Sequence, residues 1–204
     1  MTLQDLIERF EAEAERERAT EETPEVGIVM GSDSDLETMY GAYEALTEMG
    51  FAEITDYENP PEERFSFETY VVSAHRTPKL MDVYASTAAD RGLDVIIAGA
   101  GGKSADLPNM TASIAFPVPV IGVPVQEKSV DSVIGMPTGA PLVAVDAGKS
   151  FNAALSAVQI LAREHEGLRD RLLAYHEGLG NEVAAVSREL HGLGTPDFRA
   201  KRER

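Results

Sequence analysis

Short apolar segments recur along the chain, and each is followed by a loop of small or polar residues and then by helical spacing of apolar residues. The segments are continuously apolar, as expected of strands that are buried on both faces. Strands that alternate with helices in this way form a parallel sheet covered by helices on both sides. The chain is therefore predicted to adopt a three-layer α/β/α fold with a parallel sheet of about five strands. The predicted strands are residues 26–30, 69–72, 94–98, 118–123 and 142–145.

The helical stretches divide the 204-residue chain into a central domain and two helical extensions. Residues 1–24 form an N-terminal extension, in which a short amphipathic helix fades into a charged segment. Residues 25–165 form the α/β domain, and residues 166–204 hold a C-terminal helix and tail that pack on this domain or on a neighbouring subunit. Residues 52–66 are polar and contain adjacent prolines, which predicts a surface excursion. The predicted helices are 3–22, 36–49, 77–91, 104–115, 150–165 and 168–190, with residues 192–204 frayed.

Composition indicates an ordinary globular protein. The length suits one domain with a real core, and 43% hydrophobic residues exclude a disordered chain. No run of about 18 apolar residues occurs, so no membrane-spanning segment is expected. The N-terminal segment is charged and lacks the apolar stretch of a secretory signal, so we expect a cytoplasmic protein. The absence of cysteine excludes disulfides and thiolate metal sites.

The formal net charge of −17 restricts the partners of the protein. Such a field repels nucleic acids and anionic membranes, so neither is expected as a partner. The acidic residues are spread along the chain and lysine is scarce, a pattern that resembles adaptation to high salt, where screening weakens self-repulsion. An ordinary acidic cytosolic protein is the alternative. The lysines are Lys79, Lys103, Lys128, Lys149 and Lys201.

The loops after the strands are the places where chemistry is expected, because ligands of parallel sheets bind outside the carboxyl ends of the strands. The first such loop, GSDSD, opens a helix, and its backbone N–H groups at Gly31 and the hydroxyl of Ser32 suit an anion. Asp35 suits the hydroxyl groups of a ribose, which donate hydrogen bonds. Ordinary helix capping is the alternative, since the loop matches neither a Walker loop nor G-x-G-x-x-G.

The second loop, SAHRT, brings together residues that can bind a phosphate and move a proton. Ser73 and Arg76 can hold a phosphate, because the guanidinium presents a planar fork of donors. His75 can exchange a proton near neutral pH. The alternative is that Arg76 pairs with an acidic neighbour and that His75 is a hydrogen-bonded residue at a strand end. The position at a carboxyl strand end favours the chemical role.

The third loop, AGAGGKSAD, is rich in glycine. Gly101 and Gly102 allow a ligand to approach the backbone closely and expose their N–H groups, and Lys103 adds a positive charge. A flexible turn is the alternative. The remaining histidines lie in polar helical stretches of the C-terminal third, and no metal-binding spacing such as H-E-x-x-H occurs. We therefore predict no metal site.

Six motifs in chain order carry a resemblance to a known family. They extend from Val26 to Ala162 and read VGIVMGSDSD, VVSAHRTP, VIIAGAGG, PVIGVPVQ, GMPTGAP and NAALSAVQILA. This set resembles the carboxyaminoimidazole ribonucleotide mutase family of purine biosynthesis. The resemblance implies a flavodoxin-like fold and a homo-octamer. It also implies conversion of N5-carboxyaminoimidazole ribonucleotide to 4-carboxy-5-aminoimidazole ribonucleotide, a small-molecule nucleotide substrate, without cofactor or metal.

The resemblance also implies roles for individual residues. His75 would be the general acid and base, and Asp35 would bind the ribose hydroxyl groups. Three side chains would hold the 5′-phosphate, and two loop segments would close over the base and the carboxylate. The phosphate residues are Ser32, Ser73 and Arg76, and the closing segments are Gly101-Gly102 and Met136-Pro137.

The chain departs from the family pattern in two places. After the GAGG motif the family carries a histidine before Leu-Pro-Gly-Met, whereas here the segment is one residue longer and Asp106 stands in that place. Lys103 or Ser104 would then serve the carboxylate side of the site, or the enzyme would carboxylate aminoimidazole ribonucleotide directly with CO2. The spacing between Asp35 and Ser73 is also longer than in the family, which we interpret as an acidic surface loop.

Three functions are therefore compared. The mutase is favoured by the GAGG and GVPVQ motifs, and direct carboxylation is the alternative within the family. A non-catalytic nucleotide-binding module is the alternative from another class, and His75 argues against it because binding alone does not need that side chain.

Overall fold

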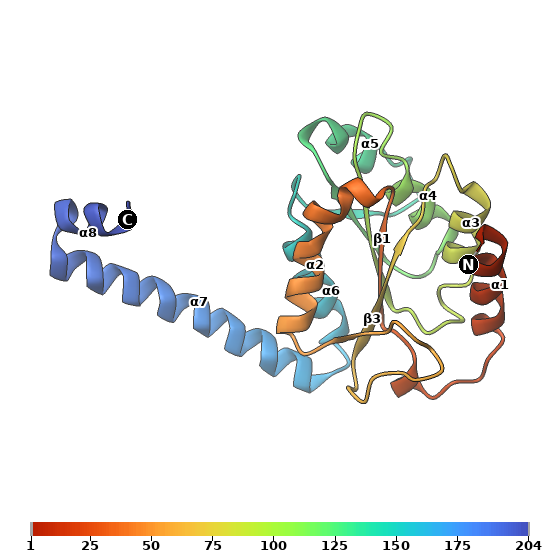
Figure 1. The fold of residues 1–204 in the computed structure, drawn as a ribbon, viewed down its shortest axis with the longest axis horizontal. Helices are drawn as coiled ribbons and strands as arrows, with labels where there is room; N and C mark the ends of the chain where they lie inside the picture. Colours follow the sequence, from red (N-terminus) through yellow and green to blue (C-terminus); the bar gives the residue numbers. More distant parts are fainter. Residues whose placement is uncertain (1, 204) are drawn as a thin grey trace. The chain divides into compact units, whose positions relative to one another are not determined.

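A computed structural model describes residues 2–203 and shows a parallel sheet with helices on both faces (Figure 1). The strand order is β2-β3-β1-β4-β5-β6, and all pairs are parallel. The predicted three-layer α/β/α class is confirmed, and the strand beyond the expected five is the two-residue edge strand β2. Without β2, the order is that of flavodoxin-like sheets. The strands are β1 (Val26–Met30), β2 (Ala52–Glu53), β3 (Ser66–Val71), β4 (Val95–Ala100), β5 (Val120–Pro124) and β6 (Val143–Ala144).

The central strands are apolar because helices cover both of their faces. Every residue of β1, β4 and β5 is buried, which explains the continuously apolar segments. In the sheet Ile28 lies opposite Ile97, and Ile97 lies opposite Ile121. Each of these three side chains is at most 1% exposed, and burying one of them contributes about 1.5–3 kcal/mol.

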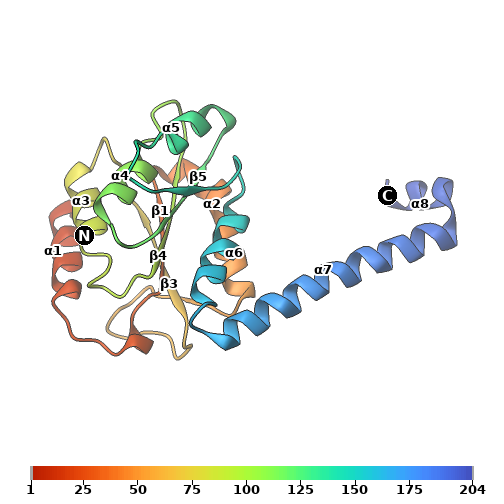
Figure 2. The same cartoon turned by 180° about the vertical axis from the view of Figure 1, so that it is seen from behind.

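The helices of the first unit form the outer layers. Helices α2 and α6 pack together on one face, whereas α1, α3 and α4 cover the other (Figures 1 and 2). The chain divides into two compact units, Met1–Leu161 and Ala162–Arg204, and the sheet with its helices belongs to the first. The helices of this unit are α1 (Leu3–Ala14), α2 (Leu36–Glu48), α3 (Pro78–Ser86), α4 (Leu107–Ile114), α5 (Val130–Ile134) and α6 (Ser150–Leu161).

Several element ends differ from the prediction. Strand β3 begins at Ser66 rather than at 69, because the N–H of Ser66 donates to the Glu25 carboxylate at 2.7 Å and the ladder with β1 starts at the next residue. Helix α3 ends at Ser86 rather than at 91, and Arg91 turns inward to pair with Glu68 at 2.6 Å. Helix α4 begins three residues later than expected, since the residues before it line a cavity.

The segment 52–66 is more than a surface excursion. It begins with β2, and Ile54, Tyr57 and Phe65 are each less than 9% exposed. The hydroxyl of Tyr57 donates to the buried carboxylate of Glu68. The apolar side chains are scattered among charged ones without a regular period. The sequence pattern therefore predicted a polar surface segment, although these side chains anchor it in the core.

The N-terminal helix α1 is part of the core of the first unit. A capping box between Thr2 and Asp5 starts the helix. Phe10 is 1% exposed and makes edge contacts with the rings of Tyr70 and Tyr84, at centroid distances of 4.8 and 5.3 Å. The predicted amphipathic helix therefore exists but ends at Ala14, before the charged residues that follow.

The second unit is helical throughout most of its length. Helix α7 (Glu166–Leu193) is longer than predicted, and the tail expected to be frayed holds α8 (Thr195–Arg202). Gly194, with φ +76°, separates the two helices, and Arg199 pairs with Glu203 at 2.8 Å. Several apolar side chains on α7 are exposed, whereas Leu168 near its start is buried. The exposed side chains include Leu173, Leu179, Val183 and Val186.

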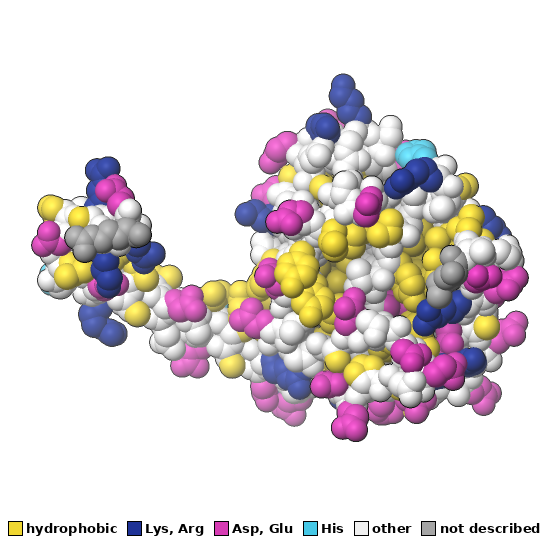
Figure 3. Space-filling model, viewed as in Figure 1, with side chains coloured by type: hydrophobic (Ala, Val, Ile, Leu, Met, Phe, Trp, Pro, Cys, Tyr) yellow, Lys and Arg dark blue, Asp and Glu magenta, His cyan; other side chains and the backbone are white. Residues whose placement is uncertain are grey.

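The surface is acidic and mixed. Asp and Glu side chains lie across the visible face rather than in a single cluster (Figure 3). None of the helices in residues 2–203 is long and apolar enough to cross a membrane.

Candidate active site

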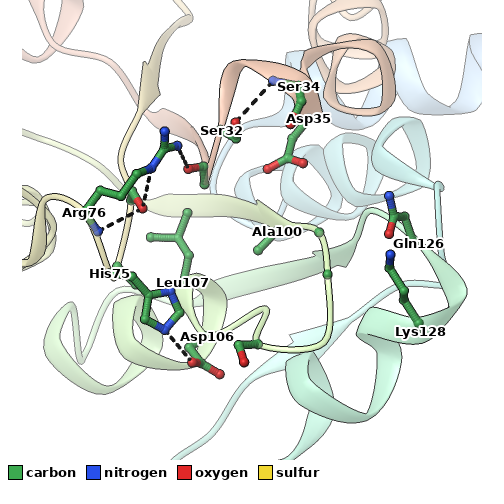
Figure 4. A pocket seen from close by; sticks show the side chains of 16 residues that line it. Ser32, Ser34, Asp35, His75, Arg76, Ala100, Asp106, Leu107, Gln126 and Lys128 are labelled. Carbon is green, nitrogen blue, oxygen red and sulfur yellow. Dashed lines mark hydrogen bonds and ion pairs between the residues drawn. The ribbon is translucent and has the colours of Figure 1, made fainter.

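A cavity of about 500 Å³ lies where β1, β3, β4 and β5 end, and its size suits a small ligand. In flavodoxin-like sheets ligands bind at this end of the strands. The structure brings loops that are far apart in the sequence into one wall (Figure 4). The lining residues are Gly31, Ser32, Ser34, Asp35, Ser73, Ala74, His75, Arg76, Ala100, Gly101, Gly102, Ser104, Asp106, Leu107, Gln126 and Lys128.

The loop after β1 places a buried carboxylate in the cavity wall. Ser32 has an extended backbone, its carbonyl accepts the N–H of Asp35 at 3.0 Å, and Asp35 is 6% exposed. Burial raises the pKa of the Asp35 carboxyl, opposed by the backbone hydrogen bond from Ser32 and by the charge of Arg76. A Cβ on Gly101 would approach Asp35 Oδ1 to 3.0 Å, so glycine leaves room for this carboxylate. Asp35 is thus held as an acceptor for hydrogen-bond donors on a ligand.

The loop after β3 is closed by a pair of side-chain hydrogen bonds. Thr77 Oγ1 accepts the N–H of Ser73 and donates to the carbonyl of Ser73, both at 3.0 Å. Thr77 stands at the N-cap of α3 as expected, but its hydroxyl closes this loop instead of capping the helix. The loop therefore presents Ser73 and Arg76 from a tight turn.

Arg76 joins two of the loops. Its Nη2 donates to the carbonyl of Gly31 at 3.0 Å, and its Nε donates to Ser73 Oγ at 3.4 Å. Among residues 2–203 no carboxylate lies within ion-pair distance of Arg76. The alternative interpretation, in which Arg76 forms an ion pair with an acidic neighbour, is therefore not supported. A guanidinium carries five N–H donors, and those left over can bind an anion.

The glycine-rich loop after β4 forms another wall of the cavity. Gly102 has φ +85°, a conformation that side-chain-bearing residues rarely adopt. Its carbonyl accepts the hydroxyl of Ser129 at 2.8 Å, which ties the loop to the turn after β5. Gly101 and Gly102 both line the cavity, whereas Lys103 beside them does not.

His75 and Asp106 meet at the cavity wall. His75 Nε2 lies 3.0 Å from Asp106 Oδ2, and the other oxygen of Asp106 accepts the hydroxyl of Ser132 at 3.1 Å. Figure 4 shows the ring of His75 with one edge turned to Asp106. The two residues are 31 positions apart in the chain and meet only in the folded protein.

Several lining residues were given no role from the sequence, among them Gln126 and Lys128. Gln126 and Lys128 follow β5 and lie across the cavity from Arg76 (Figure 4). The strand-end rule points to this loop, and Gln126 ends the PVIGVPVQ motif, but the residues E-K-S that follow carry no recognisable motif. Ser132 was also missed, because nothing in the sequence of α5 signals a contact with Asp106.

Three predicted site residues do not line this cavity. Lys103 is exposed beside it, and Met136 and Pro137 line a separate shallow hollow with Asn109 and Met110. Within residues 2–203, no group of three or more His, Cys, Asp or Glu side chains is arranged to hold a metal ion.

The geometry combines anion binding with proton transfer. Ser73 and Arg76 form one donor-rich side together with Ser32, whose hydroxyl donates to Asp33 Oδ1 at 3.0 Å. His75 stands beside this side with a carboxylate partner. Imidazole can act as acid and base near neutral pH. A phosphorylated substrate bound by the donors would therefore have a proton-transfer group next to it.

The sequence is similar to proteins of one family. The AIR carboxylase family model matches residues 25–182. The N5-carboxyaminoimidazole ribonucleotide mutase of Mycobacterium tuberculosis (strain CDC 1551 / Oshkosh) is 46% identical over 178 residues, which are 84% of this chain and 93% of that protein. The mutase of the same name from Thermotoga maritima is 38% identical over 186 residues, which are 88% and 99% of the two chains.

The fold also matches a solved structure. The crystal structure of Treponema denticola PurE superposes with a TM-score of 0.66 and 23% sequence identity, over 82% of this chain and 98% of that one. At this identity the match supports the fold alone.

Proposed function

Because this chain belongs to the AIR carboxylase family, we propose that it is an isomerase that converts N5-carboxyaminoimidazole ribonucleotide to 4-carboxy-5-aminoimidazole ribonucleotide in purine biosynthesis. The observation that carries the proposal is the position of His75 in the cavity wall beside the donors Ser73 and Arg76. A nucleotide held there by its phosphate would place its base near the imidazole. The 38–46% identity to mutases over most of the chain favours this reaction over direct carboxylation.

The substrate is proposed to bind with its phosphate and ribose at fixed places. Ser32, Ser73 and Arg76 hold the 5′-phosphate through hydroxyl and guanidinium donors. Asp35 accepts the hydrogen bonds of the ribose hydroxyl groups, a role that its position in the wall supports. The N–H groups of Gly31 and of the Gly101-Gly102 segment approach the ligand closely, as glycine permits. Lys103 and Met136-Pro137 are proposed to complete the closed site.

The reaction proceeds by two proton transfers through one histidine. Protonated His75 gives its proton to the carbamate nitrogen, the C–N bond breaks, and CO2 leaves while the electron pair stays on nitrogen. The C4 carbon of the ring then attacks CO2, and His75 removes the C4 proton. The imidazolium is restored, so protons balance over the cycle, and a group that is first acid and then base requires a pKa near the working pH.

Retention of CO2 beside the ring is the second requirement. Recapture in the same cavity replaces a dilute bimolecular reaction by a reaction between held partners. Closure of the site excludes water and prevents loss of the intermediate. The loops that form the cavity walls supply this enclosure in the proposal.

The assembly and the location of the protein are also proposed. We expect a homo-octamer in the cytoplasm, in which the exposed apolar stripe of α7 packs on a neighbouring subunit. Its acidic surface suits a high-salt interior, where screening weakens the repulsion between carboxylates. Neither nucleic acid nor membrane is a proposed partner.

Two parallel assays test the reaction. Purified protein is mixed with N5-carboxyaminoimidazole ribonucleotide, and separately with aminoimidazole ribonucleotide plus bicarbonate. We expect turnover of the carbamate, with most of the substrate carboxyl retained when labelled bicarbonate is present. If the protein turns over only the mixture of aminoimidazole ribonucleotide and bicarbonate, the direct carboxylase is supported. If it binds both nucleotides but turns over neither, a nucleotide-binding module is supported.

A further inference from the structure

Both oxygens of the Asp106 carboxylate are engaged, one by the proposed acid–base residue. Oδ2 lies 3.0 Å from His75 Nε2, and Oδ1 accepts the hydroxyl of Ser132 at 3.1 Å. We propose that Asp106 is a positioning residue that holds His75 in one ring orientation and one tautomer, so that Nδ1 exchanges the proton with the substrate. This inference rests on the proposed function and assigns Asp106 to the histidine instead of to the substrate.

The side chain of Asp106 does not cap the helix that this residue begins. Asp106 occupies the N-cap of α4, where an aspartate usually accepts a backbone N–H of the first turn. Here the side chain makes no capping hydrogen bond and extends instead to His75. Helix capping therefore does not explain why a carboxylate stands at this position.

Ser132 restricts the carboxylate from the other side. Its hydroxyl donates to Asp106, and its backbone carbonyl accepts a hydrogen bond from the side-chain Nδ2 of Asn109 at 2.7 Å. Asn109 lies on α4, so this second bond connects α5 to the helix that carries Asp106. The chain of contacts links His75, Asp106 and Ser132 from three separate elements, and each contact reduces the freedom of the next.

The chemical consequence follows from the acceptor character of a carboxylate. An ionised carboxylate only accepts, so the ring nitrogen facing it carries the hydrogen. Neutral His75 then has its lone pair on Nδ1, and protonated His75 donates from Nδ1 while Nε2 keeps its hydrogen bond. The same atom can thus give the proton to the carbamate nitrogen and later take the proton from C4, without rotation of the ring.

A direct contact of Asp106 with the reacting carboxyl group is disfavoured. Both substrate and product carry a carboxylate, and two like charges at short distance repel each other. The oxygens of Asp106 are also already paired with His75 and Ser132. Acting through the histidine uses the negative charge to stabilise the imidazolium that forms in each cycle.

The tautomer is measured directly by nuclear magnetic resonance. The chain has only 4 histidines, so long-range 1H–15N spectra of the ring nitrogens are simple, and His75→Asn identifies the signal of His75. In the neutral form of the ring we expect the Nε2–H tautomer in the wild-type protein and a mixture of tautomers in Asp106→Ala. A neutral His75 with its hydrogen on Nδ1 would overturn the inference, whatever the enzyme turns over.

Kinetics of matched variants supply the second readout. We expect Asp106→Ala to lower kcat about 10- to 100-fold, the loss typical of residues that orient a functional histidine, with KM within about threefold. This is below the ~10⁴-fold loss of a buried triad aspartate, because the side chains of His75 and Asp106 are 61% and 41% exposed. The kcat of Asp106→Asn should lie between those of the wild-type protein and Asp106→Ala, since the amide oxygen can still accept from Nε2. The loss of kcat in Ser132→Ala should be smaller than in Asp106→Ala.

Asp131→Asn is the control. It removes a carboxylate from α5 beside Ser132, but its side chain is exposed and does not line the cavity. We expect it to keep the wild-type kcat. A folded Asp106→Ala protein with kcat within threefold of wild type would contradict the positioning role. If the wild-type protein turns over neither substrate, the proposed function fails, whereas the tautomer of His75 still decides this inference.

Discussion

Single residues of the cavity are held in different ways. Arg76 and Ser73 are presented by a turn that Thr77 closes, so their donors are set before a ligand arrives. Asp35 is buried in the wall, while His75 is exposed to the cavity and paired with Asp106. Substitutions of these residues should therefore affect binding, stability and turnover differently.

Replacement of His75 should remove catalysis without removing the site. His75→Asn is expected to lower kcat by about 10²- to 10⁴-fold, the usual contribution of a general acid–base group. Folding and binding should persist, because the side chain is 61% exposed and the proposed phosphate contacts are made by other residues. Steady-state kinetics and substrate binding by calorimetry check this. A near-normal rate would show that the assigned role is wrong.

Replacement of Arg76 should weaken binding more than chemistry. Arg76→Ala is expected to raise KM by about 10- to 100-fold, because hydrogen bonds to charged groups contribute roughly 1.5–3 kcal/mol each. The value of kcat should change little, since the phosphate is held equally in ground and transition states. Arg76→Lys keeps the charge but lacks the planar fork of donors, so its KM should lie between those of the wild-type protein and Arg76→Ala. An unchanged KM would contradict the phosphate role.

Burial of Asp35 should make stability depend on pH. Because burial raises its pKa above the ordinary value of 3.8, the folded protein binds this proton more tightly than the unfolded chain does. As the pH rises from 3.8 through the raised pKa, the free energy of unfolding therefore falls. Above the raised pKa, the full cost of burying the ionised carboxylate is present. Asp35→Asn should increase the free energy of unfolding at neutral pH, with a smaller gain toward pH 3.8.

Denaturant unfolding at several pH values measures this effect, with Asp33→Asn as the control. Asp33 is in the same loop but exposed. Its carboxylate accepts the hydroxyl of Ser32, and its charge adds to the raised pKa of Asp35, so its substitution should change stability much less than Asp35→Asn does. An Asp35→Asn protein that is less stable than wild type at every pH would contradict the expected burial cost.

At the scale of elements, α1 and the 52–66 segment cover a buried ion pair. Arg91 and Glu68 have side chains at most 1% exposed and pair at 2.6 Å. The guanidinium of Arg91 lies 4.7 Å from the ring centroid of Phe10 and 4.6 Å from that of Tyr84. Tyr57 donates a further hydrogen bond to Glu68. A buried ion pair is tolerated in a core only when its remaining polar atoms also have partners. The 52–66 segment supplies the hydrogen bond from Tyr57, and α1 supplies the ring of Phe10.

Removal of the Phe10 ring should therefore destabilise the whole first unit. Phe10→Ala is expected to reduce the free energy of unfolding by about 3–5 kcal/mol, the usual cost of deleting a buried aromatic ring. Leu3→Ala on the same helix is the control, because Leu3 is 49% exposed and should cost less than about 0.5 kcal/mol. Chemical denaturation measures both. Equal stabilities of the two variants would show that α1 is not part of the core in solution.

At the scale of the whole molecule, charge is the dominant property. A net charge of −17 on 204 residues produces self-repulsion that added salt screens. The apolar stripe of α7 is the other global feature, since exposed Leu and Val on one helix favour association with another surface. Ionic strength should therefore act on stability and on assembly.

The melting temperature should rise with the concentration of KCl. Thermal unfolding at neutral pH, followed from low to molar KCl, is expected to show a steady increase, because screening lowers the repulsion in the folded state. The increase should shrink near pH 4.6, where the chain carries little net charge. A flat response at neutral pH would count against adaptation to high salt.

The general plan of the fold, and many of the residues that line the cavity, could be predicted from the sequence. Strands buried on both faces have a continuous apolar signature, so β1 was predicted with its observed ends at Val26 and Met30. The loops that line the cavity follow predicted strands, so the strand-end rule points to them from the order of the elements alone. The anchored segment 52–66 was missed, because its few buried side chains have no period and owe their burial to α1 and β3.

The sequence by itself determined the alternation of strands and helices and the place of His75, Ser73 and Arg76 at a strand end, because periodicity and turn chemistry are local properties. Only the tertiary structure decided that Asp106 meets His75, that Lys128 and not Lys103 lines the cavity, and that Ser132 holds the carboxylate. These contacts join residues on different loops and helices. Their geometry depends on how the parallel strands stack side by side, and no local pattern in the sequence records it.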